Sequence, residues 1–222
     1  MPTPKIHISI ANEVNKFLHY NNDSVLIGSI LPDQTTTDHT ISHYQKNRDG
    51  VDGVANADLF LKNKNLPKDI KVGYIIHLLT DSYVNIFIFN NYCVFDKDKL
   101  IGYRKKNKTI SCESDKVKRM KHTDCFTYEN YLLLHDLVPK INSLDCLDKI
   151  KDFDNINFNK DSIKTLTDSL SVDIDNAKKF NKLKRLLFIP RYNLVSTKEM
   201  NLFFRSCTKY IINYLEKNKD KI

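Results

Sequence analysis

An apolar run from Ile70 to Phe89 constrains the fold more than any other part of the sequence. It contains no proline and is too long for a single strand, so we predict one helix of about twenty residues, buried on most sides. His77 and Asp81 lie four residues apart inside this run. Residues at that spacing share one face of a helix, one turn apart. The sequence therefore predicts an imidazole and a carboxylate side by side in the core.

Burying such an ionisable pair is costly unless the pair has a partner. A divalent cation suits imidazole together with carboxylate. The alternative is a neutral histidine hydrogen-bonded to the aspartate as a satisfied pair in the core, which is the commoner role for an isolated pair of this kind. The remaining sequence has to decide between the two interpretations.

The composition is that of a globular protein with an excess of positive charge. The chain has 222 residues, 41% of them hydrophobic, which is enough for one sizeable core and excludes disorder as its general state. The formal charge of +8 favours anionic partners such as phosphate esters, nucleic acid or a membrane surface. This charge is weak support, because Lys, Asn and Ile are abundant together.

The cysteines and the N-terminal sequence bear on the compartment. Five scattered cysteines form no C-x-x-C pair, so we expect free thiols in a reducing compartment. No apolar segment of a signal peptide follows the N-terminus, and His77 and Asp81 interrupt the one run long enough to be a transmembrane segment. We expect a cytoplasmic protein with no transmembrane segment.

Helical spacing recurs along most of the chain. Thr3-Pro4 has the pattern of a helix start, and Ser196 to Glu199 has the pattern of a capping box. Strand signals are sparse, so the predicted class is all-α, a multi-helix bundle. We expect one domain over 1–222, with metal-site helices in 1–92, a basic excursion in 93–122 and C-terminal helices in 123–222.

Candidate metal ligands are concentrated in the first 81 residues, each at the edge of an apolar element: His7, Asp33, His43, His77 and Asp81. A lone histidine such as His7 is more often a satisfied core residue, and the polar loop 34–42 before His43 is as easily a solvated loop. Taken together, imidazoles and carboxylates without thiolates suit zinc in a hydrolytic site, or iron or manganese. Five ligands are enough for one or two ions.

Four blocks carry a resemblance to a known family. They are His7-Ile8-Ser9-Ile10-Ala11, Gly28-Ser29-Ile30-Leu31-Pro32-Asp33, Ser42-His43-Tyr44 and Gly73-Tyr74-Ile75-Ile76-His77-Leu78-Leu79-Thr80-Asp81. In order and spacing they resemble the zinc-dependent phospholipase C family, in the broad sense that includes small bacterial members. The blocks cover about the first 90 residues. Over the rest, the likeness is only that the sequence is predicted to be helical.

The resemblance implies an all-α metallohydrolase, an orthogonal helix bundle around a buried zinc site that cleaves phosphoric diesters with a metal-activated water. Carried over by motif, His43, His77 and Asp81 resemble the ligands of one zinc, and His7 and Asp33 those of a second. Asp33 would transfer the proton to or from the attacking water. His122 and His135 lack the glutamate of the family's third zinc site, which leaves Asp124 as the candidate for a further ligand or base.

A second function class remains open at this point. The stretch 104–121 contains eight Lys and Arg but only two acidic residues, and 178–185 is a second basic stretch. The simplest interpretation is a solvated excursion, and the other is a basic flap over an anionic substrate. The alternative function is a non-catalytic helical binding protein that contacts nucleic acid or a membrane, with a nucleotide or an anionic lipid as its ligand. The leading hypothesis is a metal-dependent hydrolase of a phosphate-ester substrate.

Overall fold

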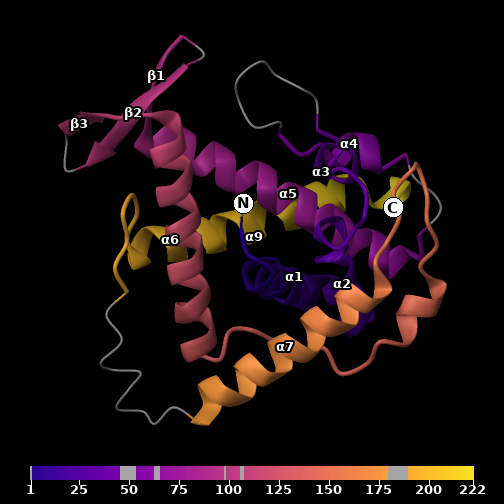
Figure 1. Cartoon of the computed structure of the whole chain (residues 1–222). Helices are drawn as coiled ribbons and strands as arrows, with labels where there is room; N and C mark the ends of the chain where they lie inside the picture. The colour runs from indigo at the N-terminus through magenta and orange to yellow at the C-terminus, as the bar shows by residue number, and fades with distance from the viewer. Residues whose placement is uncertain (1, 46–53, 63–65, 98, 106–107, 180–189) are drawn as a thin grey trace.

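The structure, a computed structural model, describes residues 2–45, 54–62, 66–97, 99–105, 108–179 and 190–222. The described part is mostly helical (Figure 1). Its helices are α1 (Pro4–Leu18), α2 (Asn22–Gly28), η1 (Leu31–Asp33), α3 (His39–Ser42), α4 (Ala57–Phe60), α5 (Lys68–Tyr92), α6 (Ser114–Leu134), η2 (Asp145–Lys149), α7 (Lys160–Lys179), α9 (Thr197–Lys217) and η3 (Lys219–Lys221). Of the basic stretch 178–185, residues 180–185 lie outside the described residues.

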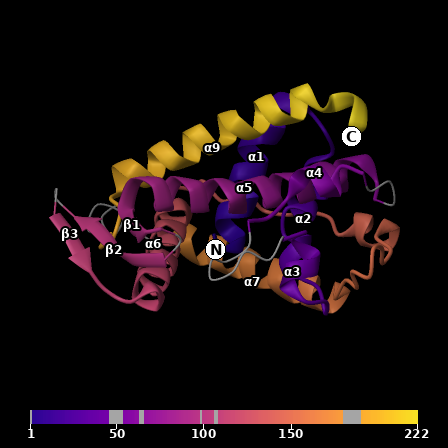
Figure 2. The same cartoon turned by 90° about the horizontal axis from the view of Figure 1, so that it is seen from above.

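The predicted central helix is confirmed as α5, which is 25 residues long. It packs against α1, α2, α4 and α9, and α9 runs alongside it (Figure 2). Among the described helices, α5 alone has the length and apolar composition to cross a membrane. However, 72% of its most apolar window is buried inside the protein, as expected for a core helix.

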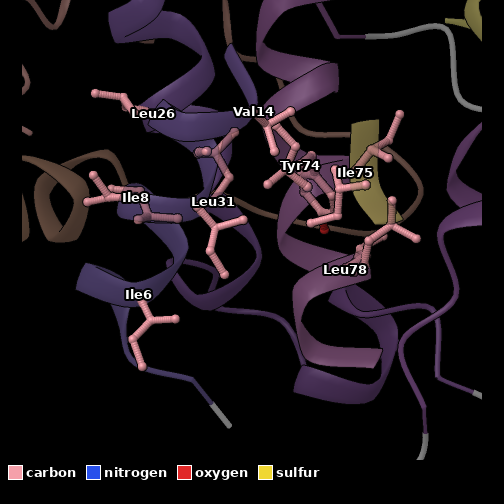
Figure 3. Packing of buried hydrophobic residues seen from close by; sticks show 14 of the residues in the cluster. Ile6, Ile8, Val14, Leu26, Leu31, Tyr74, Ile75 and Leu78 are labelled. Atoms are coloured by element: carbon pink, nitrogen blue, oxygen red, sulfur yellow. The ribbon is translucent and has the colours of Figure 1, made fainter. Parts of the chain in front are cut away.

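Two glycines allow α2 and α5 to pack closely. A Cβ on Gly28 would lie 2.3 Å from the carbonyl oxygen of Ile70, and one on Gly73 would lie 2.2 Å from that of Val25. Real Cβ atoms do not come so near, so only glycine permits this approach. Figure 3 shows the neighbouring core, in which Leu26 of α2 and Tyr74 of α5 belong to one cluster of buried side chains with Ile8 of α1.

The predicted helix starts are placed correctly. Thr3 is the residue before α1, and Pro4 occupies its first turn, although the Thr3 side chain makes no capping hydrogen bond. Ser196 and Glu199 form the predicted capping box at the start of α9. These signals are local in sequence, which is why they transfer directly to the structure.

The all-α class is wrong for residues 93–111. These residues form a three-stranded antiparallel sheet of β1 (Cys93–Asp96), β2 (Lys99–Lys105) and β3 (Lys108–Ser111), in the order β1-β2-β3. Cys93 and Tyr103 are buried, and β2 packs against α6. The basic excursion predicted for 93–122 is therefore this sheet followed by the first part of α6. That helix begins at Ser114, inside the predicted excursion and before the predicted boundary at 123.

Candidate metal centre

The five predicted ligands come from four elements and meet in one cluster. His7 lies on α1, Asp33 ends η1, His43 directly follows α3, and His77 and Asp81 lie on α5. The three histidines are fully buried, and Asp81 is 2% exposed. The Asp33 side chain keeps 19% of its surface exposed, so it forms the solvent-side edge of the cluster.

Backbone carbonyls fix the orientation of two of the histidine rings. His77 Nδ1 lies 2.8 Å from the carbonyl oxygen of Ser29, and His43 Nδ1 lies 3.0 Å from that of His39. A carbonyl oxygen only accepts hydrogen bonds, so in each ring Nδ1 is the donor. In the neutral ring this leaves the Nε2 lone pair free. An Nδ1–H held by a carbonyl is the usual support of a metal-ligating histidine.

The two free nitrogens point at each other. His43 Nε2 and His77 Nε2 are 3.0 Å apart. Two lone pairs at this distance repel each other unless a positive charge lies between or beside them. That charge is either a proton on one ring or a cation bound by both.

Both carboxylates lie at similar distances from these nitrogens. Asp33 Oδ1 is 3.4 Å from His43 Nε2 and 3.8 Å from His77 Nε2. Asp81 Oδ2 is 3.4 Å and 3.6 Å from the same two atoms. A tetrahedral zinc ion with bonds of about 2.0–2.1 Å separates its ligand atoms by roughly 3.3 Å. The spacings of His43 and His77 from each other and from each carboxylate therefore fit ligands of one zinc ion.

His7 adds an imidazole on the other side of Asp81. Its ring stacks on that of His77 with centroids 3.8 Å apart, and its Nε2 lies 3.4 Å from Asp81 Oδ1. Both ring nitrogens of His7 and both oxygens of Asp81 are buried without a hydrogen-bond partner among the described residues. Unpaired buried polar atoms are costly. A cation could take one ring nitrogen of His7 and the oxygens of Asp81, so the residues present fit a metal ion.

The two residues predicted to hold a second zinc, His7 and Asp33, also lie in one group of candidate ligands. His7, Asp33 and His77 offer ligand atoms within 4.8 Å of one another, as do His43, His77 and Asp81. Asp33 is thus shared between His7 and the pair His43 and His77. The cluster is one continuous set of donors that could hold a metal ion.

His39 is a sixth member that the sequence analysis did not select. Its ring stacks on that of His43 with centroids 3.6 Å apart, and it groups with Asp33 and His43 within 4.8 Å. Its Nε2 is buried, with no hydrogen-bond partner in the part of the chain that the structure describes. Residues 39–42, predicted as loop, form the helical turn α3, whose first turn is capped by Asp38. The spacing of four residues between His39 and His43 was the available signal.

The charges in the cluster favour ionised carboxylates. Burial acts to raise the pKa of Asp33, but His77 and the hydrogen bond from His43 prevail and lower it to about 2. The pKa of Asp81 is held well below its usual value in the same way, by His77 and by the nearby rings of His43 and His7. Burial acts to lower the pKa of His43, and the two neighbouring carboxylates raise it to about 9.

The pKa values of His7 and His39 shift in the opposite direction to that of His43. Burial, together with the neighbouring His77, lowers the pKa of His7, and burial together with His43 lowers that of His39. Without a metal, these shifts favour a protonated His43 between the two carboxylates and neutral rings at His7 and His39. Neutral imidazole and ionised carboxylate are the forms that bind metal ions.

A pocket of about 670 Å³ reaches the cluster at Asp33. Its walls come from the start of α1, from α6 and from α7, and include Phe126 and Leu170. Lys5 lies in the same wall, paired with Glu129 and Asp173. This volume is within the usual range of small-molecule sites. Asp33 is the ligand candidate that a molecule in the pocket would meet.

Asp124 is not part of the cluster. Its two carboxylate oxygens accept hydrogen bonds from the backbone nitrogens of Asn193, Leu194 and Val195, at 2.6, 2.7 and 3.1 Å. It is fully buried and fully used in holding this segment before α9. The suggestion that Asp124 serves as a further ligand or base is therefore wrong.

No protein-family model matches the chain, and neither the curated proteins nor the solved structures contain a match to it.

Proposed function

We propose that this protein is a metal-dependent hydrolase of phosphoric esters, of the zinc-dependent phospholipase C type. Its centre would be formed by His43, His77 and Asp81, with a fourth position left to water and Asp33 at the solvent-side edge. The observation that carries the proposal is the 3.0 Å approach of two histidine Nε2 atoms whose Nδ1 atoms both face backbone carbonyls. A cation between them removes the repulsion and satisfies the buried oxygens of Asp81.

The donor set selects the chemistry. Two imidazoles and a carboxylate without thiolate suit zinc, with iron or manganese as the other candidates. A bound zinc ion would supply a Lewis acid for a phosphoryl oxygen and lower the pKa of water toward neutrality. His7 stands beside the free oxygen of Asp81, so the same cluster has a place for a second ion held by His7 and Asp33.

Asp33 would connect the metal centre to the substrate. It is the cluster residue that lines the pocket, and its low pKa keeps it ionised near neutral pH. An ionised carboxylate at that edge can accept a proton from a water and later return it to the leaving alcohol. The ester would lie in the pocket, with its phosphoryl group at Asp33 and the remainder between α6 and α7.

The first experiment is metal analysis by mass spectrometry on protein purified without an affinity tag. Wild type is compared with the double variant His77→Ala, Asp81→Ala. A matched control, His135→Ala with Asp168→Ala, removes the same residue types from exposed positions outside the cluster. We expect one or two transition-metal ions per chain in wild type and in the control, and none in the cluster variant.

Activity is then measured on bis(p-nitrophenyl) phosphate as a generic phosphodiester. Wild type and control should hydrolyse it, and the cluster variant should not. Wild-type protein without stoichiometric metal, even after incubation with zinc, would mean that the histidines and aspartates are only a core network. Protein that binds metal but hydrolyses none of a range of phosphoric esters would leave a metal centre without the proposed chemistry.

A further inference from the structure

The positive charge of the chain is concentrated in one stretch of the sequence. Residues 93–122 contain ten Lys and Arg and four Asp and Glu, a net charge of +6 out of +8 for the chain. In the structure this region is the sheet β1–β3 and the start of α6. The sheet extends from one end of the helical body, beside the C-terminal end of α5 (Figures 1 and 2).

The register of the sheet places like charges opposite each other. Lys105 on β2 pairs directly with Lys108 on β3, and Arg104 is next to Lys105. Directly opposed like charges destabilise an antiparallel pair. All three side chains are exposed, and none of them forms an ion pair with another described residue. This end of the sheet therefore carries positive charge that is not neutralised within the described structure.

Exposed apolar side chains lie on the same sheet. Phe95 on β1 is 38% exposed and Ile101 on β2 is 37% exposed. Basic residues and exposed apolar residues on one sheet are a combination that binds an anionic bilayer, since the charges attract lipid head groups and the apolar groups enter the interface. We propose that the sheet β1–β3 docks the protein onto a membrane that contains anionic lipid.

The composition of the sheet favours a membrane over nucleic acid. Binding of single strands uses several aromatic platforms, and Phe95 is the exposed aromatic residue in the described strands. Reading of a duplex groove relies on Arg, Asn and Gln side chains, and Arg104 is the one such residue in the described strands. A surface of lysines with aliphatic and phenyl groups fits a layer of phosphate head groups better.

The test is sedimentation of the full chain with phosphatidylcholine vesicles, with and without phosphatidylserine. We expect binding only when phosphatidylserine is present, and loss of binding as salt is raised. Each lysine near an anionic surface strengthens partitioning about fivefold, so Lys105→Glu, which changes the charge by two, should weaken it roughly 25-fold. The control Lys209→Glu makes the same charge change on α9 and should have little effect.

The same variant separates folding from docking. Lys105→Glu converts the Lys105 and Lys108 pair from like to opposite charge, so the sheet should be equally stable or more stable while vesicle binding falls. A variant that melts earlier than wild type would be replaced by Lys108→Glu, which makes the same conversion. Equal binding to vesicles with and without phosphatidylserine, no binding at all, or binding to a DNA duplex in preference to vesicles would each overturn the proposal.

Discussion

Gly28 on α2 and Gly73 on α5 lie against each other so closely that neither position has room for a Cβ. Ser29, the next residue after Gly28, presents its carbonyl oxygen to His77, one helical turn after Gly73. The close approach of the two helices therefore also sets the orientation of a candidate metal ligand. Packing and site geometry depend on the same pair of glycines.

We predict that Gly73→Ala destabilises the protein although alanine is the better helix former. Helix propensity alone would favour the alanine by about 1 kcal/mol. The new Cβ would meet the Val25 carbonyl oxygen at 2.2 Å, and overpacking of this kind costs about 1–3 kcal/mol or more. Urea unfolding measures the net effect, with Asn90→Ala on the exposed face of α5 as the control. A Gly73→Ala variant as stable as wild type would mean that the helices can separate without cost.

Asp124 gives a prediction about folding stability in which the metal plays no part. Asp124→Ala leaves the backbone N–H groups of Asn193, Leu194 and Val195 without their acceptor. An orphaned buried donor costs about 1–3 kcal/mol, so the free energy of unfolding should fall by about 3 kcal/mol or more. Metal content per folded chain should not change. If Asp124→Ala loses metal at temperatures where the chain is folded, then Asp124 is a metal ligand after all.

Patterns that depend on near neighbours were readable from the sequence. The length of the apolar run predicted α5, and the spacing of four residues predicted that His77 and Asp81 share one face. Their convergence with His43 and His7 is a tertiary contact between four elements. It was expected only from the resemblance of the motifs, because the spacing within one helix carries no information about the others.

Two features were missed for physical reasons. The strands β1, β2 and β3 are short, and their lysines and exposed residues obscure any alternation, because only part of one face is covered by α6. The turn α3 has four residues, too few for a hydrophobic period, so the spacing of His39 and His43 was attributed to a loop. Such a short helix is stabilised by its Asp38 cap and by tertiary contacts.

His39 leads to a prediction about affinity. Its ring stacks on that of His43, and its Nε2 is buried. His39 also belongs to one group of candidate metal ligands with His43 and Asp33. His39→Ala should therefore weaken zinc binding by about 10–100-fold, the usual effect of a residue that supports a ligand. His77→Ala should abolish binding. Competition with a chromophoric chelator measures both, with His135→Ala as the control, and unchanged zinc affinity in His39→Ala would leave His39 as a packing residue only.

The pKa of His43 gives a prediction about pH. The two carboxylates overcome burial and hold this pKa at about 9 in the folded metal-free chain, against about 6.5 in the unfolded chain. A raised pKa stabilises the fold fully below pH 6.5, and this stabilisation is lost as the pH rises to 9. The metal-free protein should lose up to about 3 kcal/mol over this window.

The stabilisation that a metal provides depends on pH in the opposite direction. Zinc competes with the proton for His43 Nε2, so the gain in unfolding free energy on adding zinc should grow as the pH rises from 6.5 to 9. The measurement is urea unfolding at both ends of this window, with chelator and with zinc. His43→Gln removes the titrating group, so its metal-free stability should vary less with pH than that of wild type. If the metal-free wild type is as stable at pH 9 as at pH 6.5, then His43 is not the protonated member of the cluster, and another group must separate the two Nε2 atoms.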